Sequence, residues 1–99
     1  MARFDVHALA RGGTLVVDCQ ADLLDGLRTR VVVPLIPKSA APKPARHLNP
    51  VFVVGGERFV LMTQLLAAVE ARELGAKVGS LASEGESVLA ALDFLLTGV

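Results

Sequence analysis

The segment VFVVGGERFVLM, residues 51–62, limits the possible folds more than any other part of the chain. Two runs rich in β-branched and aromatic residues flank Gly55 and Gly56. A glycine pair between two such runs predicts a β-hairpin, because the favoured two-residue turns need positive φ at their central residues. With that turn, Phe52 faces Phe59 across the two strands, whereas a four-residue turn would shift the pairing. The chain is therefore expected to contain at least one antiparallel strand pair.

Three segments before this hairpin also have strand-like patterns. Apolar and polar residues alternate over Phe4–Ala8, and a turn at Arg11–Gly13 leads to a returning strand over Thr14–Gln20. The run Arg30–Leu35 is β-branched without clean alternation, which is typical of a central strand covered on both faces. Pro34 is expected only near the end of that strand or at a bulge, because proline has no N–H for a ladder hydrogen bond.

Less regular segments separate these elements. All five prolines lie within residues 34–50, so residues 36–50 are expected to form an exposed loop. The acidic segment 21–27 predicts a loop or a single helical turn. Residues 65–69 fit either a helical turn or coil, and the alternation over residues 69–74 predicts a weak strand.

The last segment predicts a helix that begins at Ser83. Ser83 and Glu86 have the spacing of a capping box, in which each side chain accepts the other residue's backbone N–H. At 100° per residue, one broad apolar face contains Val88, Leu89, Ala91, Leu92, Leu95 and Leu96. This face is expected to dock on the sheet. Strands followed by one helix predict an α+β, mainly β fold with an antiparallel sheet, in a single domain over residues 1–99.

Composition favours a protein that binds other proteins. Hydrophobic residues make up 53% of the chain without counting glycine, above the about 45–50% with glycine that is usual for globular domains. The excess predicts an exposed apolar interface, and a homodimer is the simplest form. The formal net charge is zero, so direct nucleic-acid binding is not expected.

The sequence also predicts where the protein is found. Cys19 is the single cysteine, so an internal disulfide is excluded and a reducing cytoplasm is expected. No apolar run is long enough for a membrane span, and no signal peptide is expected.

Side chains with catalytic potential do not form a known motif. His7 and His47 are far apart in the sequence and lack an acidic partner at ligand spacing. His7 is therefore expected to be a strand surface residue, and His47 a loop residue. The carboxylates near residues 18–25 are expected to cap turns and to pair with Arg28 and Arg30. A thiol in an apolar strand is expected to be inert. The residues therefore predict a binding protein with no catalytic residue, no metal and no cofactor.

Three segments together resemble the CcdB family, the toxins of toxin–antitoxin pairs that poison DNA gyrase. They are VVDCQADLLDGLRTRVVVPL (16–35), LNPVFVVGGERFVLMTQ (48–64) and ALDFLLTGV (91–99), in the family's order and near its spacing. The resemblance implies an SH3-like antiparallel barrel with a small side sheet and a C-terminal helix, assembled as a two-fold homodimer. It implies two further partners. One is the A subunit of DNA gyrase, whose DNA cleavage complex is trapped, and the other is a cognate antitoxin with a disordered C-terminal segment.

The resemblance also implies which residues contact gyrase. The matching positions are Leu23, Leu24, Asp93, Phe94, Thr97, Gly98 and Val99. The best-studied family pattern has tryptophan at the position of Thr97, and tryptophan is the more typical interface anchor. Residues 97–99 also fit a plain helix end, in which Gly98 is the left-handed residue after the last turn. For Leu23 and Leu24 the alternative is a small satellite of the core.

Basic residues mark the expected antitoxin surface. An acidic, disordered antitoxin tail would be attracted to a loop and a turn that carry Arg11, Lys38, Lys43 and Arg46. These charges equally fit a role in solvating a loop. Two other functions stay open: a ribonuclease-type toxin that shares the barrel, and an inactive relative that still binds an antitoxin.

Overall fold

Seven antiparallel strands and one C-terminal helix form the fold, in a computed structural model that describes residues 2–98. The strands are β1 (Asp5–Leu9), β2 (Leu15–Asp18), β3 (Thr29–Pro37), β4 (Val51–Val54), β5 (Glu57–Leu61), β6 (Ala67–Glu70) and β7 (Leu74–Ser80). The helix α1 spans Gly85–Thr97, and the short 3₁₀ turns are η1 (Asp22–Leu24), η2 (Thr63–Leu65), η3 (Ala71–Glu73) and η4 (Ala82–Glu84). This mainly β fold confirms the predicted class.

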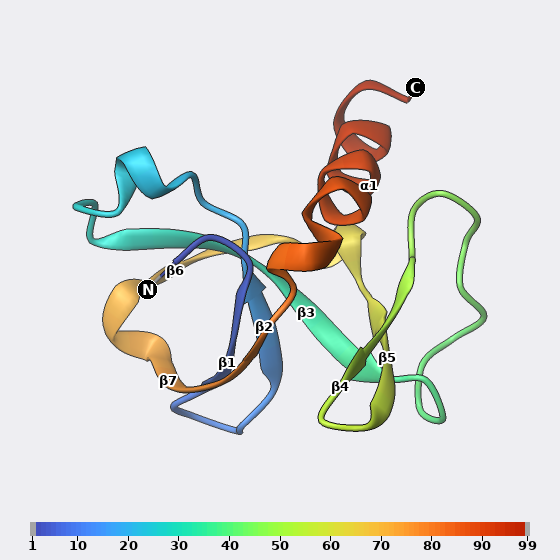
Figure 1. Ribbon diagram of the computed structural model, residues 1–99, viewed down its shortest axis with the longest axis horizontal. Coiled ribbons are helices and arrows are strands. Elements are labelled where there is room, and N and C mark those ends of the chain that lie inside the picture. The colour runs from blue at the N-terminus through green and yellow to red at the C-terminus, as the bar shows by residue number, and fades with distance from the viewer. Residues whose placement is uncertain (1, 99) are drawn as a thin grey trace.

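The strands form one curled sheet with the shape of a half-barrel (Figure 1). Their order is β4-β5-β3-β2-β1-β7, and β6 pairs with β3 outside this path. The long strand β3 changes neighbour along its length, since Thr29–Val32 pairs with β6 and Leu35–Pro37 pairs with β5. The β4–β5 hairpin therefore extends from one end of the sheet. None of the helices among residues 2–98 is long and apolar enough to cross a bilayer.

The predicted hairpin is present with the predicted register. Gly55 and Gly56 have φ values of 60° and 82°, as the two-residue turn requires. Phe52 pairs with Phe59, and both rings are buried in the main core. Local turn chemistry and cross-strand packing thus select the same arrangement.

Pro34 lies inside β3 rather than near its end, which corrects the expectation. Its Cα partner on β2 is Val16, and its carbonyl accepts the N–H of Met62 on the opposite side. The amide position of a strand residue points to the same side as its carbonyl. The missing N–H therefore faces the point where β3 changes neighbour from β6 to β5, and the β2–β3 ladder loses no hydrogen bond.

The weak strand predicted over residues 69–74 is wrong. The structure has β6 ending at Glu70, a 3₁₀ turn over Ala71–Glu73 and β7 starting at Leu74. Glu70 and Glu73 form a capping box around this turn, each side chain accepting the backbone N–H of the other. Two carboxylates three residues apart therefore close a turn here, and alternation of charge was the wrong signal.

The capping box predicted at Ser83 is absent. Ser83 lies in η4, and α1 begins at Gly85 with no side-chain cap hydrogen bond. A Cβ on Gly85 would lie 2.7 Å from Cε2 of Phe4, and the Phe4 carbonyl also accepts the N–H of Leu81. Contact with the N-terminal segment therefore positions the start of the helix.

The apolar face of α1 is only partly covered. Val88 and Ala91 are buried in the core, which consists of Val6, Val17, Cys19, Val33, Leu35, Phe52, Phe59, Leu61, Leu81, Val88 and Ala91. Leu92 packs against this core, but Leu96, predicted on the buried face, is 71% exposed. The last turn of α1 projects beyond the sheet (Figure 1), so nothing within the described chain covers it.

Candidate functional site

The end of α1 carries four of the residues expected to contact a target. Asp93, Thr97 and Gly98 are exposed and Phe94 is half-buried. Gly98 ends the helix in the left-handed conformation with φ 77°, and its N–H donates to the carbonyl of Phe94. Thr97 donates from Oγ1 to the carbonyl of Asp93 at 2.6 Å. The helix end is therefore closed by its own hydrogen bonds, while Val99 lies outside the described residues.

Phe94 also borders a cleft between the helix and the loop before β4. The cleft has a volume of 520 Å³ and is lined by His47, Pro50, Ser87, Ala90, Ala91 and Phe94. The His47 ring lies 5.8 Å from the Phe94 ring, centroid to centroid. The sequence predicts only an ordinary loop residue at His47. Its φ of 67°, uncommon for a non-glycine residue, is a structural feature that its spacing could not predict.

Asn49 fastens this loop to the sheet. Its Oδ1 accepts the N–H of Ala45, and its Nδ2 donates to the carbonyl of Leu61 and to Oε1 of Gln64. Thr63 also donates from Oγ1 to the carbonyl of Leu48. A buried amide with these partners fixes the loop conformation, since leaving any of them unpaired would cost about 1–3 kcal/mol.

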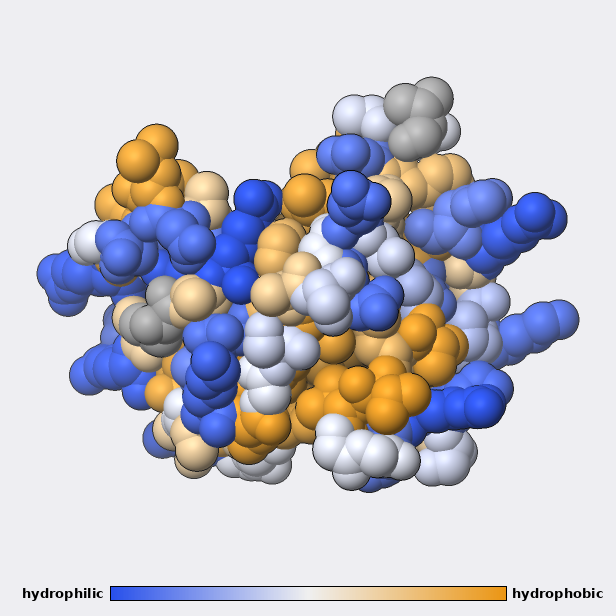
Figure 2. All heavy atoms as spheres, in the orientation of Figure 1, coloured by the Kyte–Doolittle hydropathy of each residue, from blue (hydrophilic) through white to orange (hydrophobic). Residues whose placement is uncertain are grey.

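The other predicted contact residues lie on the η1 loop, residues 21–28. Leu23 is 94% exposed, and Leu24 and Leu27 are about half exposed, so this tip is not a satellite of the core. The η1 loop and the end of α1 project on the same side of the molecule (Figure 1). Figure 2 shows them as two separate projections, the η1 tip strongly hydrophobic, with the surface hollowed between them.

A buried ion pair lies at the base of this loop. Arg30 donates from Nε to Oδ2 of Asp18 at 2.9 Å, its Nη2 lies 2.7 Å from the same oxygen, and both side chains are fully buried. The expected pairing of Arg30 with a nearby carboxylate is therefore confirmed. Arg28 makes no ion pair within residues 2–98. Asp22 instead accepts the backbone N–H of Arg3 at 2.7 Å.

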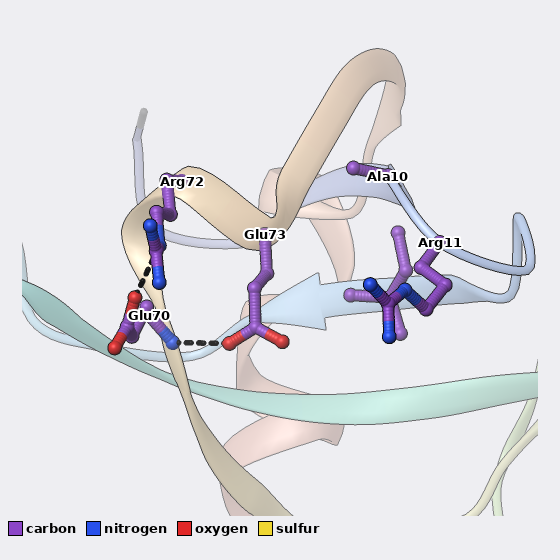
Figure 3. Close-up of a pocket in the computed structure, with 6 residues that line it drawn as sticks. Ala10, Arg11, Glu70, Arg72 and Glu73 are labelled. Atoms are coloured by element: carbon purple, nitrogen blue, oxygen red, sulfur yellow. Dashed lines mark hydrogen bonds and ion pairs between the residues drawn. The ribbon is translucent and has the colours of Figure 1, made fainter.

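The four predicted basic residues lie on two different surfaces. Lys38, Lys43 and Arg46 are on the loop between β3 and β4, and all three are exposed. Arg11 lines a separate pocket of 640 Å³ with Leu9, Ala10, Glu70, Arg72 and Glu73. In Figure 3, the side chains of Arg11 and Glu73 extend into the same hollow, and Arg72 bonds to Glu70. Two carboxylates thus accompany Arg11, whereas the basic loop has none.

Other titratable groups lie inside the protein. The prediction that His7 lies on the strand surface is wrong: His7 is buried where β7 pairs with β1, and its Nδ1 lies 3.1 Å from the carbonyl of Gly75. Burial and the neighbouring Asp18 carboxylate raise the pKa of the Cys19 thiol to about 12, so the thiol is protonated at neutral pH. Among residues 2–98, no group of three His, Cys, Asp or Glu side chains is arranged to hold a metal ion.

Solved structures of similar fold include an endoribonuclease and a toxin. An endoribonuclease in complex with its cognate antitoxin, from a mycobacterial species, superposes with a TM-score of 0.78 at 14% identity, covering 97% of this chain and 94% of that one. Mycobacterium tuberculosis toxin MazF-mt6 gives 0.76 at 14% identity over 93% and 95%. Identity this low shows a shared fold alone.

Sequence comparison is more specific than fold comparison. The family model described as CcdB protein matches residues 3–98. This range contains the η1 loop, the β4–β5 hairpin and the helix through its glycine cap. The chain belongs to the CcdB family.

Proposed function

We propose that this protein is the toxin of a type II toxin–antitoxin system and that it binds the A subunit of DNA gyrase. One observation carries the proposal: a chain of the CcdB family presents its capped helix end free of its own core. Leu23, on the same side, adds an exposed apolar contact. Two exposed projections of this kind suit a protein target, because burying their apolar side chains on binding favours association.

The proposed action is binding without bond chemistry. Phe94 and the η1 leucines supply apolar area, and Thr97 and Gly98 shape the narrow end of the helix. Bound between the two A subunits of a gyrase that has cut DNA, the toxin would block resealing. Thr97 offers less apolar area than tryptophan would, so we expect weaker binding than an aromatic anchor gives.

A homodimer completes this proposal. Leu65 on η2 and Leu96 on α1 are both more than half exposed, and η2 packs against α1. Exposed leucines on adjoining elements form the kind of apolar surface that a second copy covers. A two-fold dimer would present two helix ends to a two-fold target.

The basic loop is the proposed site for an antitoxin. No Asp or Glu occurs between Asp25 and Glu57, so Lys38, Lys43 and Arg46 have no acidic neighbour within their own segment. An acidic, disordered tail would gain attraction along this loop. Arg11, which shares its pocket with Glu70 and Glu73, would contribute less.

Direct binding to the purified gyrase A subunit tests the proposal. Calorimetric titration of the full chain is expected to show saturable binding, and Phe94→Ala or deletion of Gly98 and Val99 is expected to weaken it at least about 10-fold, as loss of an anchor does. Arg58→Ala, at an exposed position on β5, is the matched surface control. Absence of binding by the unaltered chain would contradict the proposal.

A ribonuclease-type toxin is the second candidate, favoured by the fold shared with the endoribonuclease that binds a cognate antitoxin. His7, the histidine of the sheet, is buried and contacts a backbone carbonyl, so it is poorly placed as a surface acid or base. Cleavage of a defined RNA by the purified chain, lost on His7→Ala, would favour this candidate. An inactive relative would bind an antitoxin but would neither bind the gyrase A subunit nor cleave RNA.

A further inference from the structure

The η1 loop is exposed at every residue from Asp22 to Thr29. Core packing therefore does not hold it. Three backbone bonds turn the chain locally: Leu24 N–H donates to the carbonyl of Ala21 at 2.9 Å, Asp25 N–H to that of Asp22 at 3.1 Å, and Leu27 N–H to that of Leu24 at 3.2 Å. Such isolated turns are weak on their own. Asp22 ties the first turn to the backbone N–H of Arg3. Leu24 and the tip beside it need a further contact to be held in place.

Gln20 lies where this loop leaves the sheet, and its side chain links the two sides of the loop. Its exposure is only 7%. The amide Nε2 donates to the carbonyl of Leu24 at 2.9 Å, and Oε1 accepts the N–H of Val31 on β3 at 3.1 Å. One buried amide therefore connects the tip of the loop to the strand that follows it.

The backbone of Gln20 is in turn held by the buried Asp18–Arg30 ion pair. Its backbone N–H donates to Oδ1 of Asp18 at 3.1 Å, while Arg30 holds Oδ2 of the same carboxylate. Charge-assisted bonds of this kind are stronger than neutral ones. A continuous series of hydrogen bonds thus runs from the buried Asp18–Arg30 pair, through Gln20, to Leu24 beside the exposed Leu23.

We propose that Gln20 is a positioning residue of the target-binding surface: it touches no partner, but holds the η1 loop so that Leu23 and Leu24 are presented in one arrangement. This inference rests on the proposed function. If the loop samples many arrangements and the target binds only one, the apparent affinity is the intrinsic affinity multiplied by the populated fraction of that arrangement. Loss of the Gln20 amide is therefore expected to weaken target binding through Leu23.

Amide hydrogen exchange on the full chain tests the holding role without any partner. Gln20→Met keeps the length of the side chain and removes both hydrogen bonds, and Val60→Ala is the control, a fully buried β5 residue away from the loop. Each variant is measured at the same number of degrees below its own Tm. The N–H groups of Leu24 and Val31 are then expected to exchange at least about 10-fold faster in Gln20→Met than in the control. Equal exchange in the two variants would overturn the proposal.

A double-mutant cycle tests the positioning role. Gln20→Met is expected to raise the Kd for the gyrase A subunit about 10-fold in the unaltered chain, but less than about 3-fold when Leu23→Ala is already present. A merely structural residue would give equal effects in both backgrounds, and that result would overturn the inference. Gln20→Glu, which keeps the acceptor for Val31, serves if Gln20→Met does not fold.

The two proposals fail in distinguishable ways. If the unaltered chain does not bind the gyrase A subunit, the proposed function fails, and hydrogen exchange still decides whether Gln20 holds the loop. If the unaltered chain binds and the cycle is additive, the proposed function stands and the role of Gln20 is refuted.

Discussion

Replacing Asp18 by asparagine should destabilise the fold severely. Asparagine keeps an oxygen for the N–H of Gln20 but leaves the charge of Arg30 without its partner. Both side chains are fully buried, and removing one member of a buried pair costs about 3–5 kcal/mol because the other charge stays desolvated. A domain of 99 residues has a total stability of about 5–15 kcal/mol. The variant would therefore lose at least about a fifth of its stability, and most of it if the total lies at the low end of that range.

The matching fall in Tm is at least about 12 °C, since about 1 kcal/mol shifts the Tm of a domain this size by about 4–8 °C. Thermal unfolding followed by circular dichroism measures it. Asp25→Asn, at an exposed position, is the control and should shift Tm by less than about 3 °C.

A paired replacement separates charge from packing. Asp18→Asn with Arg30→Met removes both charges and keeps an oxygen for the N–H of Gln20, so it should recover most of the lost stability. Stability of Asp18→Asn within about 1 kcal/mol of the unaltered chain would refute this reasoning, because the pair would then be solvated or dispensable.

Three further outcomes follow from the packing. Gly85→Ala should lower the free energy of unfolding by about 1–3 kcal/mol in urea titration, because the new Cβ meets the ring of Phe4; an unchanged midpoint would show that the ring moves freely. Leu92→Asp should lower it by about 3 kcal/mol, because the carboxylate would lie against the core; normal stability would show that this position is solvated. Cys19 should resist iodoacetamide at pH 8 in the folded chain and react on unfolding, because its pKa is about 12; rapid labelling of the folded protein would contradict its burial.

Local chemistry made the hairpin predictable. Gly55 and Gly56 require a tight turn, and the turn then sets Phe52 against Phe59. Elements whose position depends on distant contacts were not predictable in the same way. The start of α1 depends on Phe4, which is far from Gly85 in the sequence, and the pattern at Ser83 carries no trace of that contact.

The candidate site likewise contains residues that the sequence pointed to and residues that it did not. The resemblance located the exposed helix end and the η1 leucines, but not the groups that hold them. The buried side chains of Gln20 and Asn49 make two and three hydrogen bonds, respectively, and neither residue stood out in the sequence. Their signal was a single amide at the end of an apolar strand or beside a proline, which is common in loops of every kind.

The exposure of Leu96 shows why a helical wheel alone predicts too many buried residues. Leu96 lies on the apolar face of the wheel, yet the last turn of α1 projects beyond the sheet. This part of the apolar face was therefore predicted to be buried, but nothing within the described chain covers it. The same exposure supports the proposal that a second copy of the chain covers it.

The most direct test of the central claim is a DNA cleavage assay with the purified chain, purified bacterial gyrase, supercoiled plasmid and ATP. The account predicts linear DNA after denaturation, lost when Gly98 and Val99 are deleted although the shortened chain keeps its Tm. Absence of linear DNA at high concentration of the folded, unaltered chain would contradict gyrase poisoning. A large fall in Tm on the deletion would contradict the assignment of this tail to the target rather than to the core.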